Sequence, residues 1–225
     1  MVNNSRAGKV AKYAIVLATI FVAMFLDRAI SLGFPVSAAT IVLLVTFSFA
    51  LLENDLGSAI ICCSLFGLAS FVKEFIPFLQ SSVALLPIYV RPVVTLVPRM
   101  TMGLVLFGVY RLMLTLTKKM SSARGRQVLS IVVAVFFALV TNTVLFLGLL
   151  NLFKTVFNIQ HDSIIALIKT GLAINIPVEY LVSMLFVSPV VLGVRRGLKL
   201  GVDGNGIKQN KPENQAQNND NGENQ

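Results

Sequence analysis

The stretch "VRPVVTLVPRMTMGLVLFGVYRL", residues 90–112, has the composition of one long apolar helix that carries an arginine near its middle. About 20 apolar residues in a helix are enough to cross the hydrocarbon core of a membrane. An arginine such as Arg99 is costly at that depth unless it faces a protein interior, a partner charge or water. The stretch therefore predicts a membrane helix with a functional side chain, and the rest of the chain must supply the surroundings of that side chain.

Composition points to the same class. Of 225 residues, 56% are hydrophobic and only 13% are charged, which leaves too few polar groups to cover a soluble globule of this size. The net charge of +9 comes from short basic clusters between apolar runs, not from one basic patch with interleaved aromatic residues. We therefore predict an integral membrane protein in contact with lipid and without a nucleic-acid partner.

Six apolar segments are long enough to span a membrane, so we predict an all-α integral membrane domain of six transmembrane helices over residues 1–200. The segments are residues 10–30, 36–52, 57–76, 92–116, 127–153 and 164–194. With six spans, the basic clusters before the first, between the fourth and fifth, and after the sixth all fall on one side. The positive-inside rule makes that side cytoplasmic, so we expect the N-terminus and the C-terminus there.

Two connecting segments stand out by composition. Residues 201–225 are rich in Asn, Gln, Glu and Gly and are expected to form a disordered polar cytoplasmic tail. The link "PFLQSSVALLPIYVRP", residues 77–92, is a long external loop between the third and fourth helices, apolar and with three prolines. Loops of this length are often functional, so we predict a lid; the alternative is packing against the helix ends.

Polar side chains interrupt three successive helices. Arg99 lies about 10 Å below the outer end of the fourth helix, and "LVTNTVLF" places Asn142 in the middle of the fifth. On the sixth, "INIPVEYL" places Asn175 and Glu179 four residues apart, hence on one face, with Pro177 between them. Two interpretations follow: an Arg99–Glu179 ion pair with asparagines bonding across helices, or a pocket open to the outside. We favour the pocket, with Arg91 and Thr95 as further lining residues on the fourth helix.

The first helix carries small residues at helical spacing. Ala7, Ala11, Ala14 and Ala18 recur at intervals of four, three and four residues, so one face lacks bulky side chains. Such a face lets another helix approach closely. It predicts either close packing inside the domain or docking of a membrane partner.

Together these pieces resemble a known family. The six predicted helices, the Ala14-x-x-x-Ala18 motif, the long external loop and residues 90–112 are similar to a substrate-binding S component of an energy-coupling factor (ECF) vitamin transporter. The stretches "TNTVLFLG", residues 141–148, and "IPVEYLV", residues 176–182, resemble the fifth and sixth helices of its general vitamin branch. The resemblance extends to about Leu200, and Pro98-Arg99-x-x-x-Gly103 is its most specific motif.

The resemblance implies a vitamin-binding subunit of a multi-subunit importer in the plasma membrane of a prokaryote. Ala14 and Ala18, with Ala11, would dock onto a transmembrane coupling subunit that is driven by two cytoplasmic ATPases. The chain contains no G-x-x-x-x-G-K-[ST] phosphate loop, so it is expected to be no enzyme and to bind no cofactor, with ATP used by its partners.

The ligand is less determined than the mechanism. Relatives of this branch often have Asn-Pro where this chain has Arg91-Pro92, and the substitution adds a positive charge near the expected pocket mouth. An anionic vitamin suits Arg99 and Arg91, so we expect pantothenate; folate, riboflavin, hydroxymethylpyrimidine and cobalamin stay open.

Other classes of function and site are weaker. A membrane enzyme would need a nucleophile with a base or paired acids, and no such pattern stands out. An autonomous secondary carrier could use the same polar residues without partners. Cys62 and Cys63 are adjacent in one helix and His161 is the single histidine, so neither a disulfide nor a metal site is expected.

Overall fold

The computed structural model describes residues 6–33, 40–52, 54–76, 86–120, 122–157 and 176–197, and every regular element in these ranges is a helix. The all-α class is therefore confirmed for this part of the chain. In order, the elements are α1 (Arg6–Gly33), α2 (Thr40–Leu52), α3 (Leu56–Lys73), α4 (Arg91–Leu116), the 3-10 helix η3 (Thr117–Lys119), α5 (Ala123–Phe157) and α7 (Ile176–Gly197). Asn175, His161, loop residues 77–85 and the tail 201–225 lie outside the described residues.

Five of these helices are long and apolar enough to cross a membrane, which is compatible with a multi-pass membrane protein. They are α1, α3, α4 with η3, α5 and α7. The second segment differs from the prediction because α2 is apolar but has only 13 residues. That gives it a length of about 20 Å, against about 30 Å for a hydrocarbon core. Within the described residues, five helices could span a membrane and α2 is shorter, so the six predicted spans are not confirmed.

The sixth predicted segment, residues 164–194, is described only from residue 176 on. The described helix α7 begins at Ile176, so Pro177 lies in its first turn and not in the middle of a span. A proline in the first turn removes no helical hydrogen bond, because the first N–H groups of a helix have no intrahelical partner. Pro177 therefore requires no kink at this position, whereas Pro189 does lie inside α7.

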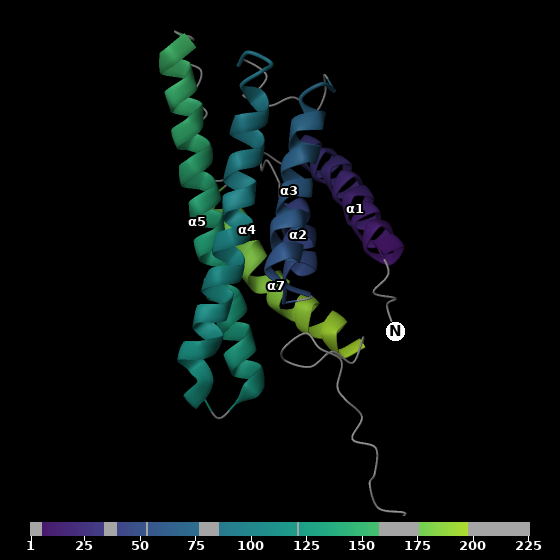
Figure 1. Cartoon of the computed structure of the whole chain (residues 1–225), viewed down its shortest axis with the longest axis vertical. Coiled ribbons are helices and arrows are strands. Elements are labelled where there is room, and N and C mark those ends of the chain that lie inside the picture. The colour runs from purple at the N-terminus through teal and green to yellow at the C-terminus, as the bar shows by residue number, and fades with distance from the viewer. Residues whose placement is uncertain are drawn as a thin grey trace, which may run out of the picture.

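The helices form a ring with one outer member. α4 packs against α3 and α5, α5 against α7, α7 against α2, and α2 against α3, while α1 packs on α2 and α3. Figure 1 shows α3, α4 and α5 nearly parallel to the long axis, with α1 and α7 inclined to them. The buried core takes side chains from every helix of this arrangement, among them Ile20, Phe47, Cys63, Leu106, Leu139 and Val187.

Small residues bring α3 and α4 unusually close together. A Cβ atom built on Gly103 would lie 2.9 Å from the carbonyl oxygen of Ala59, and one on Gly67 would lie 3.2 Å from the carbonyl oxygen of Thr95. The two glycines therefore mark two contacts between the backbones of these helices, one on each helix. Close backbone approach of this kind is typical of helix packing in membranes.

The turn from α2 to α3 is built from residues suited to it. Asn54 has φ of 52°, a left-handed conformation that asparagine tolerates better than most residues. Asp55 then caps α3, because its carboxylate accepts the backbone N–H of Ser58 at 3.0 Å. This turn reverses the chain within a few residues and sets α2 and α3 side by side.

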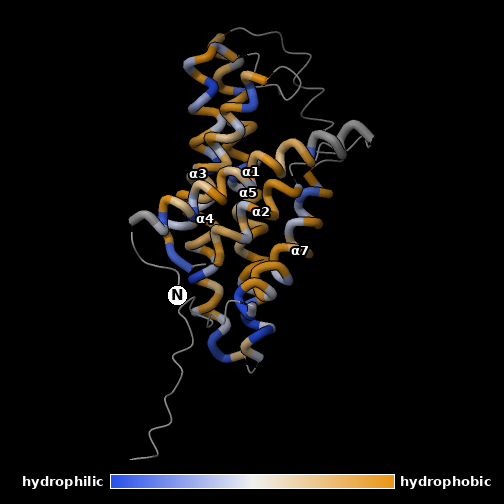
Figure 2. The backbone as a smooth tube through the Cα atoms, turned by 90° about the vertical axis from the view of Figure 1, so that its right-hand side faces the viewer, coloured by the Kyte–Doolittle hydropathy of each residue, from blue (hydrophilic) through white to orange (hydrophobic). Residues whose placement is uncertain are grey.

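Charged residues are concentrated at the helix ends. Figure 2 shows hydrophobic colour along most of the helix lengths and hydrophilic colour at the lowest turn, which joins α4 to α5. The start of α1, this turn and the end of α7 each form the lower end of their helices in Figure 1. The helix directions therefore bring the basic clusters around Lys12, Lys118 and Arg195 toward the same end.

Candidate functional site

Arg99 is placed by the proline that precedes it. Pro98 has no backbone N–H, so the carbonyl of Val94, four residues earlier, loses its helical donor. The guanidinium of Arg99 folds back along α4 and donates from Nη1 to the carbonyl oxygens of Val94, at 3.4 Å, and Thr95, at 2.8 Å. Arg99 thus replaces part of the hydrogen bonding that Pro98 removes, which explains why the two residues occur together.

Two aromatic rings enclose the guanidinium of Arg99. Its Cζ lies 5.0 Å from the ring centre of Phe66 on α3 and 5.4 Å from that of Phe146 on α5. Cation–π contacts of this kind strengthen when the cation is removed from water. They hold the charge between three helices, while its Nε is buried and has no hydrogen-bond partner.

Asn142 provides a second unsatisfied group on α5. It lies one helical turn before Phe146, and its Oδ1 is buried without a hydrogen-bond partner. Beside it, Thr143 accepts a hydrogen bond from the Tyr180 hydroxyl of α7 at 3.0 Å. This bond fixes α7 to the middle of α5, so residue 179 of α7 reaches the same region.

Two acidic side chains interact electrostatically with Arg99. Glu179 lies in the first turn of α7, where a negative charge also complements the helix dipole. Glu74, the residue that ends α3, is only 1% exposed and acts on Arg99 as well. Sequence reasoning missed Glu74, although an acidic residue directly after an apolar helix could have indicated it.

Arg91 and Thr95 have local roles in the structure. The Thr95 hydroxyl is buried and donates to the Arg91 carbonyl at 2.8 Å, within its own helix. Arg91 donates from Nε to the Leu86 carbonyl at 2.9 Å and so holds the turn that precedes α4. Leu86 and Val90 of that turn pack against Leu150 of α5. The described part of the link, from Leu86 on, packs against α5, as the alternative to a lid expects. Residues 77–85 lie outside the described residues, so the lid predicted for residues 77–92 stays a prediction.

The site therefore contains part of the predicted set. Arg99 of α4 interacts electrostatically with Glu179 of α7 and with Glu74, the residue after α3, and lies against the ring of Phe146 of α5. Asn142 lies one helical turn before Phe146 on the same helix. Asn175 lies outside the described residues. The described residues contain no group of three or more His, Cys, Asp or Glu side chains that could hold a metal ion.

The alanine face of α1 points out of the bundle. Ala11, Ala14 and Ala18 are all exposed, and Ile15 and Val22 beside them are 62% and 59% exposed. Of the two interpretations of this face, close packing inside the domain does not apply to these three residues. The face is free for lipid or for a membrane partner.

A second polar network lies at the opposite end of the bundle. Arg195 of α7 donates to the Tyr110 hydroxyl of α4 at 3.0 Å and to the carbonyl oxygen of Leu51, at the end of α2. Arg111 of α4 donates to the carbonyl oxygen of Asn54 at 3.4 Å. From the sequence, Arg195 belongs only to the basic cluster after the sixth predicted span, which was used to orient the chain in the membrane. Its 3% exposure shows that it is buried and has a structural role.

Asp27 acts at the other end of the same short helix. Its two carboxylate oxygens accept the backbone N–H groups of Ile41 and Val42, each at 3.2 Å, in the first turn of α2. Asp27 is 5% exposed. α2 is thus capped by a carboxylate from α1 at its start and by a guanidinium from α7 at its end.

Comparison with protein-family models, with curated proteins and with solved structures finds no match for this chain.

Proposed function

We propose that this chain is the substrate-binding S component of an ECF-type vitamin importer. One observation carries the proposal: Arg99 Nε and Asn142 Oδ1 are both buried and lack hydrogen-bond partners in a predominantly apolar helical bundle. Unsatisfied polar groups are costly in such a setting. A bound ligand that supplies an acceptor to Nε and a donor to Oδ1 would remove both costs.

The chemistry of the two groups favours an anion with hydroxyl or amide groups. The guanidinium is a charged donor that suits a carboxylate, and the amide oxygen of Asn142 suits a hydroxyl or N–H donor. Pantothenate carries a carboxylate, two hydroxyls and an amide, so it is our preferred ligand. Glu74 and Glu179 also act on Arg99, so the carboxylate of the ligand competes with them for the guanidinium.

The transport mechanism rests on the family resemblance of the Pro98-Arg99-x-x-x-Gly103 motif and on the exposed alanine face of α1. In this proposal Ala11, Ala14 and Ala18 dock onto a transmembrane coupling subunit. Two cytoplasmic ATPases then drive delivery of the vitamin, and this chain itself hydrolyses nothing. The basic helix ends face the cytoplasm of a prokaryotic cell, in agreement with the positive-inside rule.

Pantothenate binding to the detergent-purified full chain, measured by isothermal titration calorimetry, tests the proposal. We expect Arg99→Gln to weaken binding at least about a hundredfold, since a charge-assisted hydrogen bond and its ion pairing are lost. Arg111→Gln, at the other end of the same helix, is the matched control and should bind as the unmodified chain does. Unchanged binding by Arg99→Gln would leave Arg99 with only its role beside Pro98.

Native mass spectrometry of the chain purified from its own cells tests the partners. A coupling subunit and two ATPases that co-purify with a different vitamin would keep the mechanism and replace the ligand. Uptake by the chain alone in liposomes without ATP would instead establish an autonomous secondary carrier.

A further inference from the structure

The turn that joins α4 to α5 carries only positive charge. Arg111, Lys118, Lys119, Arg124 and Arg126 lie within 16 residues, and the sequence has no Asp or Glu between Glu74 and Asp162. Lys118, Lys119 and Arg124 are exposed. The hairpin thus presents a concentrated charge that its own two helices do not neutralise.

Exposed apolar side chains continue directly up to these charges. Leu112 and Leu116 at the end of α4 are 56% and 66% exposed, and Met120 and Leu129 are 41% and 40% exposed. Side chains of this kind are suited to lipid, so the basic residues stand where acyl chains give way to headgroups. A molecule that contacts the basic and the apolar side chains together must therefore lie at this boundary, as a lipid does.

The start of α5 adds a local reason for a counter-anion. Its first turn contains no acidic residue and includes Arg124, whose charge is unfavourable next to the positive end of a helix dipole. The Ser122 hydroxyl accepts the Gly125 N–H at 3.1 Å, whereas Arg126 Nε is buried without a partner. Nearby anionic groups would offset this local concentration of positive charge.

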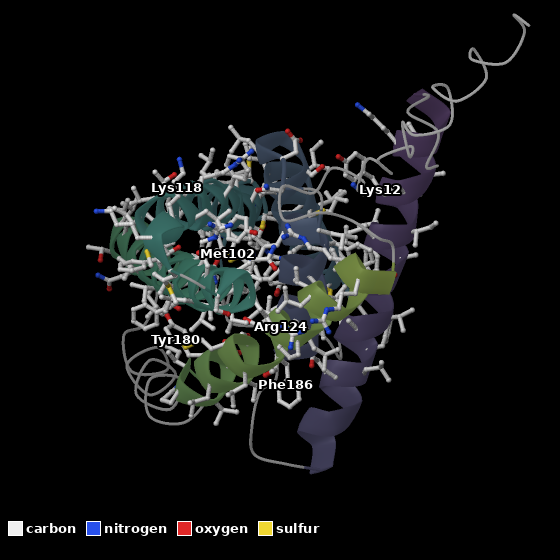
Figure 3. The ribbon with its side chains drawn as sticks, turned by 90° about the horizontal axis from the view of Figure 1, so that it is seen from below. Lys12, Met102, Lys118, Arg124, Tyr180 and Phe186 are labelled. Atoms are coloured by element: carbon white, nitrogen blue, oxygen red, sulfur yellow. The ribbon has the colours of Figure 1, made fainter. Side chains whose placement is uncertain are left out.

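The basic side chains spread around the end of the hairpin. In Figure 3, seen from below, Lys118 and Arg124 lie on different sides of the α4 and α5 ends. Such a distribution suits several headgroups at a surface better than one small phosphate ion. We propose that the α4–α5 turn is a docking surface for the headgroups of anionic phospholipids on the side of the membrane that it faces.

Lipid titration of the intact, detergent-purified chain tests this proposal by native mass spectrometry, with phosphatidylglycerol and phosphatidylcholine as probes. We expect phosphatidylglycerol to bind more tightly. Replacing two charges, Lys118→Gln with Lys119→Gln, should weaken its binding by about 25-fold, roughly fivefold for each basic residue near a membrane surface. Phosphatidylcholine binding should stay unchanged, and raising the salt concentration should reduce the preference.

A control variant keeps the charge of the turn. Lys118→Arg with Lys119→Arg changes the same two exposed side chains without removing their charge, and its phosphatidylglycerol affinity should stay within about twofold of the unmodified chain. Equal losses in the two variants, or equal affinity for the two lipids, would overturn the proposal. Matching unfolding curves for both variants ensure that a lost preference reflects the surface and not the fold.

Discussion

At the scale of single residues, the motif Pro98-Arg99-x-x-x-Gly103 divides into parts with different roles. Pro98 lacks an N–H for the Val94 carbonyl, and the side chain of Arg99 donates to this carbonyl instead. Arg99 also lies between the rings of Phe66 and Phe146, and Gly103 lets α4 approach α3. The Nε of Arg99 has no hydrogen-bond partner and is the atom that the proposed ligand would bind. One short stretch thus combines backbone repair, helix packing and the candidate binding group.

Gly103→Ala should destabilise the fold. The new Cβ would lie 2.9 Å from the Ala59 carbonyl oxygen, so the helices must separate, at a cost of about 1–3 kcal/mol in the free energy of unfolding. Gly108→Ala is the control on the same helix, because no atom lies within 4 Å of its added Cβ; it should be neutral or stabilising by up to about 1 kcal/mol. Unfolding in mixed detergent micelles measures both, and equal effects would contradict the close approach of α3 and α4.

The pairing of Pro98 with Arg99 is testable by a double-mutant cycle. Arg99→Leu should cost less stability in a Pro98→Ala background, because residue 98 then donates its own N–H to the Val94 carbonyl. We expect a coupling of about 1 kcal/mol, the usual net contribution of one hydrogen bond. Additive effects of the two substitutions in the same unfolding assay would show that Arg99 does not compensate for the proline.

At the scale of elements, α2 is the unusual helix. With 13 residues it is too short to bring both its ends to the membrane surfaces. Free backbone groups at helix ends need partners where water is scarce. Asp27 of α1 and Arg195 of α7 supply these partners, and each charge is opposite in sign to the end of the helix dipole that it caps. Two buried charges that the ligand site does not use are therefore explained by one short helix.

Asp27→Ala should lower the free energy of unfolding by about 1–3 kcal/mol, since two N–H groups of α2 lose their acceptor. Asp27→Asn keeps one acceptor oxygen and should cost clearly less. Ligand affinity should change little in either variant, because the Asp27 carboxylate caps the first turn of α2. Unfolding assays rank the variants, and an Asn variant as unstable as the Ala variant would argue against capping by the carboxylate oxygens.

At the scale of the whole molecule, a polar region between α3, α4, α5 and α7 and an exposed small-residue face on α1 lie on different parts of the bundle. α1 packs on α2 and α3, on the far side of the ring from α5. Ligand binding and partner docking can therefore be separated by mutation if the proposed function holds.

Ala14→Trp or Ala18→Trp should block vitamin uptake by cells while ligand affinity of the purified chain stays within about twofold, because an indole on this face prevents close helix approach. Val144→Trp places the same bulk on α5, at a side chain that is 64% exposed, and should leave uptake intact. Uptake assays with radiolabelled vitamin measure the difference. Normal uptake by both alanine variants would place the docking surface elsewhere.

The sequence by itself determined the all-helical, apolar character of this protein and the residues of its candidate site. In a membrane, long apolar runs are stable as helices because a helix satisfies its own backbone hydrogen bonds there. The same reasoning singled out Arg99, Asn142 and Glu179, since polar residues in apolar helices are conspicuous. Local patterns also showed the alanine spacing of α1.

Only the tertiary structure decided which partners these residues have. Phe66 and Phe146 are far from Arg99 in the chain, and nothing in their local sequence indicates that they enclose it. The caps of α2 come from distant parts of the chain. Asp27 lies 14 positions before Ile41, whose N–H it accepts, and Arg195 lies 144 positions after Leu51, to whose carbonyl it donates. Hydropathy shows how apolar a segment is. A helix as short as α2 is stable only because charges from other helices bind the free backbone groups at its ends.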